Sequence, residues 1–544
     1  MAILDARRPR RRKKKKVRKV VVRPAPKPAP KPTPKPAPTP TPTPTPQPPA
    51  TTPAQPTQPV GSAPYAATVR ERLFLNRFGT GFTQTALAQL RATGSPEQWL
   101  ADQLAPAAIV EPAKVATVED WFAPLRRTPA EKWATQVNGT KGGWEYGHDL
   151  GNRTILRRIY SRHSVLETMT DFWSTNLHIP VGHDRAWVWR AEYDATIREN
   201  ALGRFTDLLT ACSLHPAMRL YLDNWRSVKD KPNENQGREL LELHTVGRAA
   251  GYTEAMVKSS AILLSGHTVD WGSTFAPRYD TRAHTTGPVQ VLEFTHPNAS
   301  TDGQAACTAY LSFLAHHPAT ARNLATKIAR YFVSDDPSAG LVETLAQTYL
   351  AADTSITAVL KALAVHPEFL SSEGRKVRTP IADLVATARV LGVDVTGEPT
   401  GDNYARHANW TQGGPPLFSW PRPDGPPVTG GAWASSSRFF VSSGMHGNHA
   451  GGWWPKGATY RSTGASWWPA GTPSMRFDAF VDLLARTWLG RSADARLVRA
   501  AGQAIDAAGA VTAATVITPD HKAVRWMFNR LTLALLDTPD HMTT

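Results

Sequence analysis

The stretch Asn233–Gly247, NENQGRELLELHTVG, gathers glutamates, a histidine, an arginine and side-chain amides within a few helical turns. Placed on a helix at about 100° per residue, Glu239 and Glu242 fall on one face with Arg238 beside them. If that face borders a cleft, the two carboxylates could share a proton in acid–base catalysis or bind a hard metal ion through oxygen. If the face meets water, Arg238 and Glu242 form an ordinary i,i+4 ion pair.

Other polar residues could complete such a site. Asn233 and Asn235 lie beside the glutamates, while Asn176 and His178 lie in a separate run that could reach the same cleft. We include these four as candidate ligand-binding residues. His244 is a fifth candidate, but it falls on the apolar side of the helix, which favours a hydrogen-bonded core histidine over a partner of the glutamates. The sequence identifies no metal ion or cofactor.

Residues 395–475 carry a different pattern, because glycine, proline and tryptophan replace any helical period. An irregular region of ~80 residues is unusual unless it is functional or plugs a core. Trp420 and Trp433 are candidates for stacking on sugar rings or bases. The interpretation that we favour is that the tryptophans bury the loop against helices, since exposed tryptophan is costly. The tryptophans of this region are Trp410, Trp420, Trp433, Trp453, Trp454, Trp467 and Trp468.

The signatures of the better-known enzyme classes are absent from the sequence. It contains no H-E-x-x-H zinc motif, no Walker loop, no G-x-G-x-x-G after a strand, no G-x-S-x-G elbow and no EF-hand loop. A catalytic role would therefore depend on Glu239 and Glu242, with Arg238 beside them.

The elements that must position these residues are mainly helices, because strand signals are weak and helix start and stop signals recur. His215, His317 and His366 each precede a proline, and we interpret them as helix-capping or turn residues rather than metal ligands. Ser95 and Pro96 predict a cap and a first helical position. The expected helices are 67–77, 83–93, 96–104, 152–176, 192–212, 216–224, 234–247, 253–265, 301–316, 318–333, 339–351, 355–364, 379–391, 476–488, 493–507 and 520–536.

The predicted organisation has four parts. Residues 1–62 form a disordered, basic and proline-rich arm, because too few apolar residues are available there to pack a core. Residues 63–394 form a helical body, 395–475 a loop region packed on that body, and 476–544 the helices that complete it. The fold class is therefore mainly α, a multi-helix body with a long irregular segment rich in Gly, Pro and Trp.

The net charge of +17 comes mostly from the arm. Residues 1–36 hold fifteen Lys or Arg against one acid, Asp5, so this stretch accounts for +14 and the folded part is nearly neutral. Such a run binds anionic polymers, whether nucleic acid, teichoic acid or anionic lipid, without reading a sequence. The proline tract that follows predicts a polyproline II spacer, which suits a protein that stands away from a surface or reaches through a cell wall.

Cysteine content and hydropathy set further limits. Cys212 and Cys307 are too few for a disulfide scaffold or a zinc cluster, so we expect two buried free thiols. No apolar run approaches the ~18 residues of a membrane span. The basic N-terminus is followed by VRKVVVRPAP, whose apolar stretch is too short for a secretory signal peptide.

Two long stretches carry a family resemblance: residues 193–225, YDATIRENALGRFTDLLTACSLHPAMRLYLDNW, and residues 233–268, NENQGRELLELHTVGRAAGYTEAMVKSSAILLSGHT. Shorter stretches in the same order are LFLNRFGTGFTQTALAQL, HPATARNLATKIARYFVSDDP, TPIADLVATARVLG, LFSWPRPDGPP and LTLALLDTPDH. From about Leu73 to the C-terminus the chain resembles a large bacterial family known as domain of unknown function 1800. The resemblance implies a long, mostly helical body and no particular reaction.

The chain departs from that family pattern at a few positions. Asn176 stands where the family has a histidine, which puts a catalytic metal bound by that histidine in doubt. Gln236 and Gly237 replace a usual Tyr-Ala. The candidate residues that agree with the family are Asn235, Arg238, Glu239, Glu242 and His244.

The resemblance also implies a setting, because genes of this family tend to lie beside those of an uncharacterised, sulfatase-like family with twin-arginine export signals. We therefore expect an extracytoplasmic or cell-envelope accessory protein that binds or acts on polysaccharide with such a partner. The alternative location is the cytoplasm. The alternative function is a hydrolase or metal-dependent enzyme that uses the Glu239/Glu242 carboxylate pair.

Overall fold

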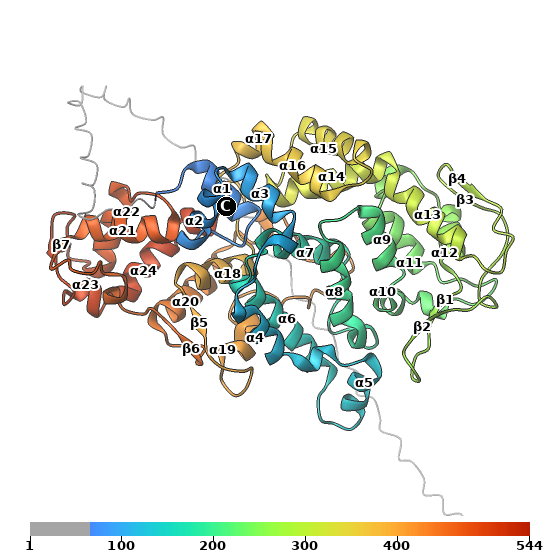
Figure 1. The fold of residues 1–544 in the computed structure, drawn as a ribbon, viewed down its shortest axis with the longest axis horizontal. Helices are drawn as coiled ribbons and strands as arrows, with labels where there is room; N and C mark the ends of the chain where they lie inside the picture. The colour runs from blue at the N-terminus through green and yellow to red at the C-terminus, as the bar shows by residue number, and fades with distance from the viewer. Residues whose placement is uncertain (1–65) are drawn as a thin grey trace, which may run out of the picture. The chain divides into compact units, whose positions relative to one another are not determined.

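The fold is given by a computed structural model of the chain, which describes residues 66–544. The predicted disordered arm and its binding of anionic polymers lie outside the described residues. Residues 66–544 fold into 25 α-helices joined by turns, short 3₁₀ helices and four two-stranded antiparallel sheets (Figure 1). The prediction of a mainly α fold is confirmed.

The elements follow one another along the chain with short connections. The helices of the first half are α1 (Val69–Arg77), α2 (Gln84–Ala92), α3 (Pro96–Gln103), α4 (Ala113–Trp121), α5 (Pro129–Val137), α6 (Gly143–Tyr160), α7 (Ser164–Asn176), α8 (Arg190–Asn200), α9 (Phe205–Ser213), α10 (Pro216–Tyr221), α11 (Asn235–Glu239) and α12 (Glu254–Leu264). Those of the second half are α13 (Gln304–His316), α14 (Pro318–Phe332), α15 (Ala339–Ala351), α16 (Ile356–Val365), α17 (Pro367–Leu370), α18 (Pro380–Val390), α19 (Tyr404–His407), α20 (Ser436–Gly451), α21 (Phe477–Leu489), α22 (Ala495–Ile505), α23 (Lys522–Arg525), α24 (Phe528–Leu536) and α25 (Pro539–Met542). The strand pairs are β1 (His267–Val269) with β2 (Pro277–Tyr279), β3 (Val289–Val291) with β4 (Phe294–His296), β5 (Asp394–Val395) with β6 (Ala458–Thr459), and β7 (Met475–Arg476) with β8 (Val516–Ile517).

The predicted capping signals are confirmed. His215, His317 and His366 are the N-caps of α10, α14 and α17, and each ring accepts a hydrogen bond from the backbone N–H two residues on, at 3.1–3.2 Å. Ser95 caps α3, whose first residue is Pro96. The side-chain acceptors satisfy backbone donors that the helix itself leaves free.

Helix boundaries differ from the prediction where a break carries no strong sequence signal. The single helices expected over 152–176, 192–212 and 520–536 are each divided into two, as α6 and α7, α8 and α9, and α23 and α24. The largest difference is α20, which forms inside the segment expected to have no helical period. Its glycines and serines lower helix propensity, but packing against α18 and α24 stabilises it.

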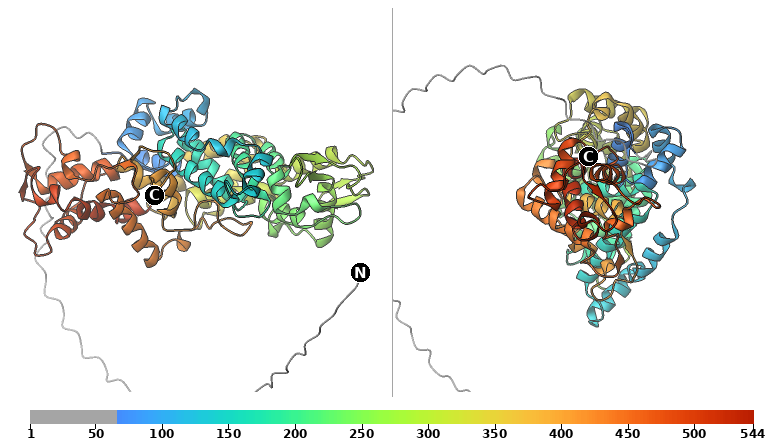
Figure 2. Two further views of the ribbon diagram at one scale, coloured as in Figure 1. Left: turned by 90° about the horizontal axis from the view of Figure 1, so that it is seen from below. Right: turned by 90° about the vertical axis from the view of Figure 1, so that its left-hand side faces the viewer.

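Two hydrophobic cores hold residues 66–544 together. One joins α1–α3 with helices between α7 and α17, and the other joins α4 and α6 with α18 and α21–α24. Helix α18 contacts both α6 and α20, so it links the middle of the chain to its C-terminal helices (Figures 1 and 2). The residue boundaries at 394/395 and 475/476 stay predictions.

The remaining sequence limits concern thiols and membranes. Cys212 and Cys307 are free and buried, as expected, and burial raises the pKa of each thiol to about 12. The thiolate, which is the reactive form, is therefore negligible at neutral pH. Among residues 66–544, no helix combines the length and apolar character needed to cross a bilayer.

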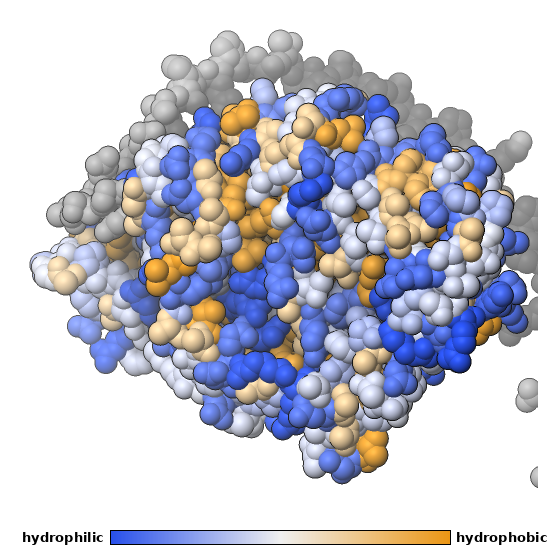
Figure 3. All heavy atoms as spheres, turned by 45° about the vertical axis from the view of Figure 1, so that its right-hand side comes forward, coloured by the Kyte–Doolittle hydropathy of each residue, from blue (hydrophilic) through white to orange (hydrophobic). Residues whose placement is uncertain are grey.

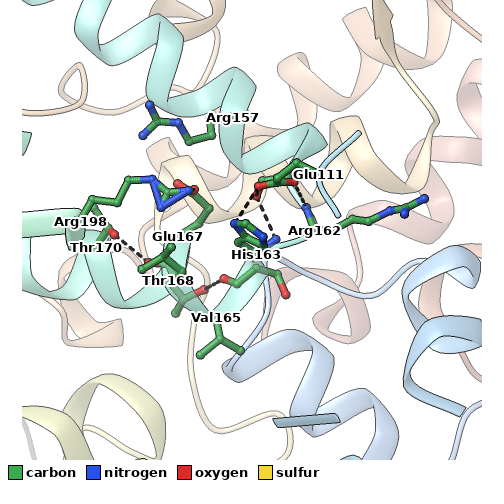
Figure 4. Close-up of polar contacts among 12 residues, drawn as sticks. Glu111, Arg157, Arg162, His163, Val165, Glu167, Thr168, Thr170 and Arg198 are labelled. Atoms are coloured by element: carbon green, nitrogen blue, oxygen red, sulfur yellow. Dashed lines mark hydrogen bonds and ion pairs between the residues drawn. The ribbon is translucent and has the colours of Figure 1, made fainter. Parts of the chain in front are cut away.

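Helix α7, which later forms part of a pocket, is fixed by charged side chains. Glu167 contacts Arg198 of α8 at 2.6 Å, and its carboxylate side chain is only 1% exposed. Glu111 contacts the ring of His163 at 3.1 Å and accepts the backbone N–H of Arg162 at 2.8 Å (Figure 4). Since a buried carboxylate is costly unless it is paired, these contacts hold the start and the middle of α7 against its neighbours.

Replacing Glu167 with Gln should lower the free energy of unfolding by roughly 3 kcal/mol, the size of loss seen when one partner of a buried ion pair is removed. Urea unfolding followed by circular dichroism measures this change. Asp120→Asn is the control, because the Asp120–Arg126 pair is solvent-exposed and should contribute less than about 0.5 kcal/mol. Equal losses in the two variants would show that α7 does not depend on Glu167.

Candidate ligand-binding pocket

A pocket lies between α7, α14, the start of α18 and residues 412–433, which we call the covering segment. It measures about 680 Å³, counting the part open to solvent, within the range of small-ligand pockets. The covering segment supplies an apolar wall: Pro415, Pro416, Leu417, Phe418, Trp420, Pro426, Pro427, Val428 and Trp433. The helical side supplies most of the polar groups: Asp171, Ser174, Thr175, His178, Tyr331 and Thr379.

Two polar atoms of the pocket have no hydrogen-bond partner among residues 66–544. They are Oγ of Ser174 and Oε1 of Gln412, both buried. Asp171, in contrast, accepts from the hydroxyl of Tyr331 at 2.8 Å and from Arg158 at 3.1 Å. Because buried polar groups are nearly always hydrogen-bonded, the two free atoms are positioned to bond a ligand or an ordered water.

His178 anchors the covering segment to the end of α7. Burial lowers the pKa of His178 to about 4, with smaller opposing effects from its hydrogen bonds, so the ring is neutral at pH 7. A neutral imidazole has one N–H. Nε2 lies 2.8 Å from the carbonyl oxygen of Trp420, whereas Nδ1 lies 3.4 Å from that of Ser174. We therefore assign the proton to Nε2, which donates to Trp420.

A lysine and an aspartate anchor the far end of the covering segment. Lys376 donates to the carbonyl of Val428 at 2.9 Å and contacts Asp335 at 2.5 Å. Asp335 in turn accepts the backbone N–H of Gly430 at 2.6 Å. The irregular backbone thus finds partners in side chains of the helical body instead of in a helix or sheet.

The tryptophans of region 395–475 divide into buried and exposed rings. Trp467 is buried, as we expected, whereas Trp410 and Trp453 are each 56% exposed and contradict that interpretation. Trp420 and Trp433 are half-buried in the pocket wall. Their indole N–H groups donate within the covering segment, Trp433 to the carbonyl of Pro427 at 2.8 Å and Trp420 to Asp424 at 3.3 Å. These local bonds fix the orientation of both rings.

The predicted catalytic stretch is not one regular helix. Helix α11 ends at Glu239, and Leu240–His244 form a π-helical turn. The wider turn is stabilised from outside, because the Thr245 hydroxyl donates to the carbonyl of Leu240 at 2.7 Å and Lys327 donates to that of Leu243 at 2.5 Å. Such turns occur often at functional sites.

The expected ion pair between Arg238 and Glu242 is wrong. Arg238 instead contacts Glu254 of α12 at 2.6 Å, and Glu242 pairs with Arg248. The π-helical turn begins between the two residues and changes the spacing on which the i,i+4 expectation depended.

Glu239 is half-buried, and its environment disfavours the charged carboxylate. Burial raises the pKa of Glu239, repulsion from Glu242 and Asp424 adds to the rise, and Arg238 and Arg248 oppose it. Asp424 belongs to the covering segment, so Glu239 lies near the rim of the pocket. Within residues 66–544, the only three His, Cys, Asp or Glu donors that converge as metal ligands include neither Glu239 nor Glu242.

The other sequence candidates have local roles. Asn233 accepts the backbone N–H of Asn235 at 2.9 Å, and Asn176 donates to the carbonyl of Phe172 at 2.8 Å. His244 is buried. The structure therefore brings together His178, Trp420 and Trp433 in one pocket, with Glu239 near its rim. The residues that sequence reasoning missed are Asp171, Ser174, Tyr331 and Gln412, which belong to no motif.

Close packing of the covering segment on α7 requires glycine at position 425. Gly425 has a φ of +70°, and a Cβ there would lie 2.1 Å from the carbonyl oxygen of Thr175. Gly425→Ala should therefore displace the segment and increase proteolytic cleavage within 412–433 at least several-fold. Gly431→Ala is the control, since its Cβ would meet no atom within 4 Å. Unchanged cleavage in Gly425→Ala would contradict this packing.

Comparison with known proteins gives a family and no activity. No curated protein and no solved structure matches the chain. A family model described as "Protein of unknown function (DUF1800)" matches residues 73–543. The match spans nearly all of the described residues, including α7, α18, α11 and the covering segment. The chain therefore belongs to the DUF1800 family.

Proposed function

We propose that this protein binds a saccharide chain of the cell envelope in the pocket beneath the covering segment. The observation that supports this most directly is that Trp420 and Trp433 line the same pocket as the unpartnered hydroxyl of Ser174. A sugar ring has an apolar face of C–H groups and an edge of hydroxyl groups. The apolar wall suits the first, and the polar helical side suits the second.

The polar groups of the pocket can distinguish a sugar from a purely apolar ligand. Oε1 of Gln412 can accept a hydrogen bond from a sugar hydroxyl, and the Ser174 hydroxyl can donate or accept. An apolar ligand would leave both atoms unpaired, at a cost of about 1–3 kcal/mol each. The rings of proline and tryptophan opposite lose little conformational entropy when a ligand binds.

The envelope setting and the partner are part of the same proposal. The basic run and proline spacer of residues 1–62 suit a protein tethered near an anionic polymer. A sulfatase-like partner would act on the chain that this protein holds. Fractionation of the native cells tests the setting, and recovery of the protein from the cytosol alone would contradict it.

Binding should depend on the two pocket tryptophans. Trp420→Ala and Trp433→Ala should each weaken binding about tenfold, which corresponds to 1.4 kcal/mol, because the stacking surface is removed. Affinity electrophoresis in gels that contain soluble β-glucan, arabinogalactan, chitin oligosaccharide or polygalacturonate measures this. Trp526→Ala is the control, since Trp526 is 72% exposed and outside the pocket. Binding of no polymer by the wild type, or equal weakening in the control, would contradict the proposal.

A second candidate function is hydrolysis of the bound chain, favoured by the raised pKa of Glu239 beside the pocket rim. A carboxylic acid that keeps its proton toward neutral pH can protonate a leaving group as a general acid. Glu242 and Asp424 are the neighbouring carboxylates, and either could act as the second acid of a glycosidase. In this case Glu239→Gln would abolish release of reducing ends from the bound polymer while binding stays.

The pKa of Glu239 also predicts a stability change that needs no substrate. The folded-state pKa is raised, so wild-type stability is lost as pH rises from about 4.3, the ordinary glutamate value, through the folded-state pKa. Glu239→Gln should therefore unfold at a higher temperature than wild type at pH 7, with the difference vanishing below about pH 4. Glu254→Gln is the control, because Arg238 lowers the pKa of Glu254; that variant should show no gain. A lower midpoint for Glu239→Gln at pH 7 would contradict the raised pKa.

A further inference from the structure

We propose that Asp383, His446 and His541 form a binding site for a divalent transition metal ion such as Zn²⁺. The three residues come from α18, α20 and α25, and all are buried. One donor atom of each lies within 4.8 Å of the other two. The site is separate from the saccharide pocket and does not depend on the function proposed for it.

The donor distances fit tetrahedral coordination. Oδ1 of Asp383 lies 3.1 Å from Nε2 of His446 and 3.4 Å from Nε2 of His541. Ligands at 2.0–2.1 Å from a tetrahedral zinc ion lie about 3.3 Å from one another. Two histidines and one carboxylate are a common ligand set for zinc and other first-row divalent metals.

The outer contacts orient each ligand toward the shared centre. Oδ2 of Asp383 accepts from the Ser442 hydroxyl at 2.6 Å and from Arg438 at 3.0 Å, so Oδ1 remains for the metal. Nδ1 of His446 lies 2.6 Å from Asp537. A proton on Nδ1 donates to that carboxylate and leaves the lone pair on Nε2. A histidine held by a second carboxylate is typical of metal sites.

A fourth position remains for an oxygen ligand. The hydroxyl of Thr387 lies 3.0 Å from Nε2 of His541, and it or a water molecule could fill that position. The two charges of the ion would be matched by the carboxylates of Asp383 and Asp537. Arg438 shares the Asp383 carboxylate through the other oxygen.

The competing interpretation is a proton in place of the metal. A doubly protonated His446 between Asp383 and Asp537 accounts for both contacts of that ring. It leaves unexplained why Nε2 of His541 also points toward the same Asp383 oxygen. A metal ion accounts for the convergence of all three donors.

Metal binding is tested on the full-length protein, stripped with chelator, incubated with ZnCl₂ and passed through a desalting column. We expect about one equivalent of zinc by mass spectrometry of the metal, and a higher unfolding temperature than for the stripped protein, because binding to the folded state stabilises it. His541→Gln should lower zinc affinity at least tenfold.

His449→Gln is the matched control, since His449 is a buried histidine of the same helix as His446 but bonds Tyr404 and the carbonyl of Met445. It should retain the zinc. Wild-type protein that holds less than about a tenth of an equivalent and shows no zinc-dependent shift in unfolding temperature would overturn the proposal. Retention of wild-type affinity in His541→Gln would do so as well. If His541→Gln fails to fold, the wild-type measurements alone decide.

Discussion

An irregular segment can lie on a helical body only if its backbone N–H and C=O groups find partners there. The covering segment 412–433 meets this constraint through side chains that come from distant parts of the chain. His178 follows α7, Asp335 follows α14, and Lys376 precedes α18. Each binds a backbone group that no helix or sheet would satisfy. The pocket exists because these anchors hold a wall of prolines and tryptophans at a fixed distance from α7.

Helix α18 serves both of the centres that we describe. Its first turn, with Pro380 and Ile381, lines the saccharide pocket, whereas Asp383 points to the two histidines of the proposed metal site. The same helix packs on α6 on one side and on α20 on the other. A metal ion at Asp383 would therefore stiffen the support of the pocket without touching a bound ligand. On the face shown in Figure 3, hydrophobic residues form small groups separated by hydrophilic ones, as expected where binding uses a pocket rather than a large apolar surface.

Much of the fold could be predicted because its signals are local. Histidine or serine followed by proline marked helix starts correctly at His215, His317, His366 and Ser95, since capping involves only neighbouring residues. Helix α20 could not be predicted, because its stability comes from packing against helices distant in sequence. The π-helical turn after Glu239 was missed for the same reason, as Lys327 of α14 bonds one of its carbonyls.

The candidate site was predictable only in part. Trp420, Trp433 and His178 drew attention by residue type, and the structure places them in one pocket. Ser174 and Gln412 are common residues whose importance comes from being buried without a partner, a property that no spacing reveals. The metal ligands lie at positions 383, 446 and 541, too far apart in sequence to resemble a motif, and only the meeting of three helices brings them together.

Hydrogen–deuterium exchange of the full-length protein, with and without the tightest-binding polysaccharide, tests the central claim most directly. If the pocket binds the chain, exchange slows in residues 412–433 and in α7, while the distant pair β3 and β4 is unchanged. Slower exchange in β3 and β4 or elsewhere, with residues 412–433 and α7 unaffected, would contradict the account.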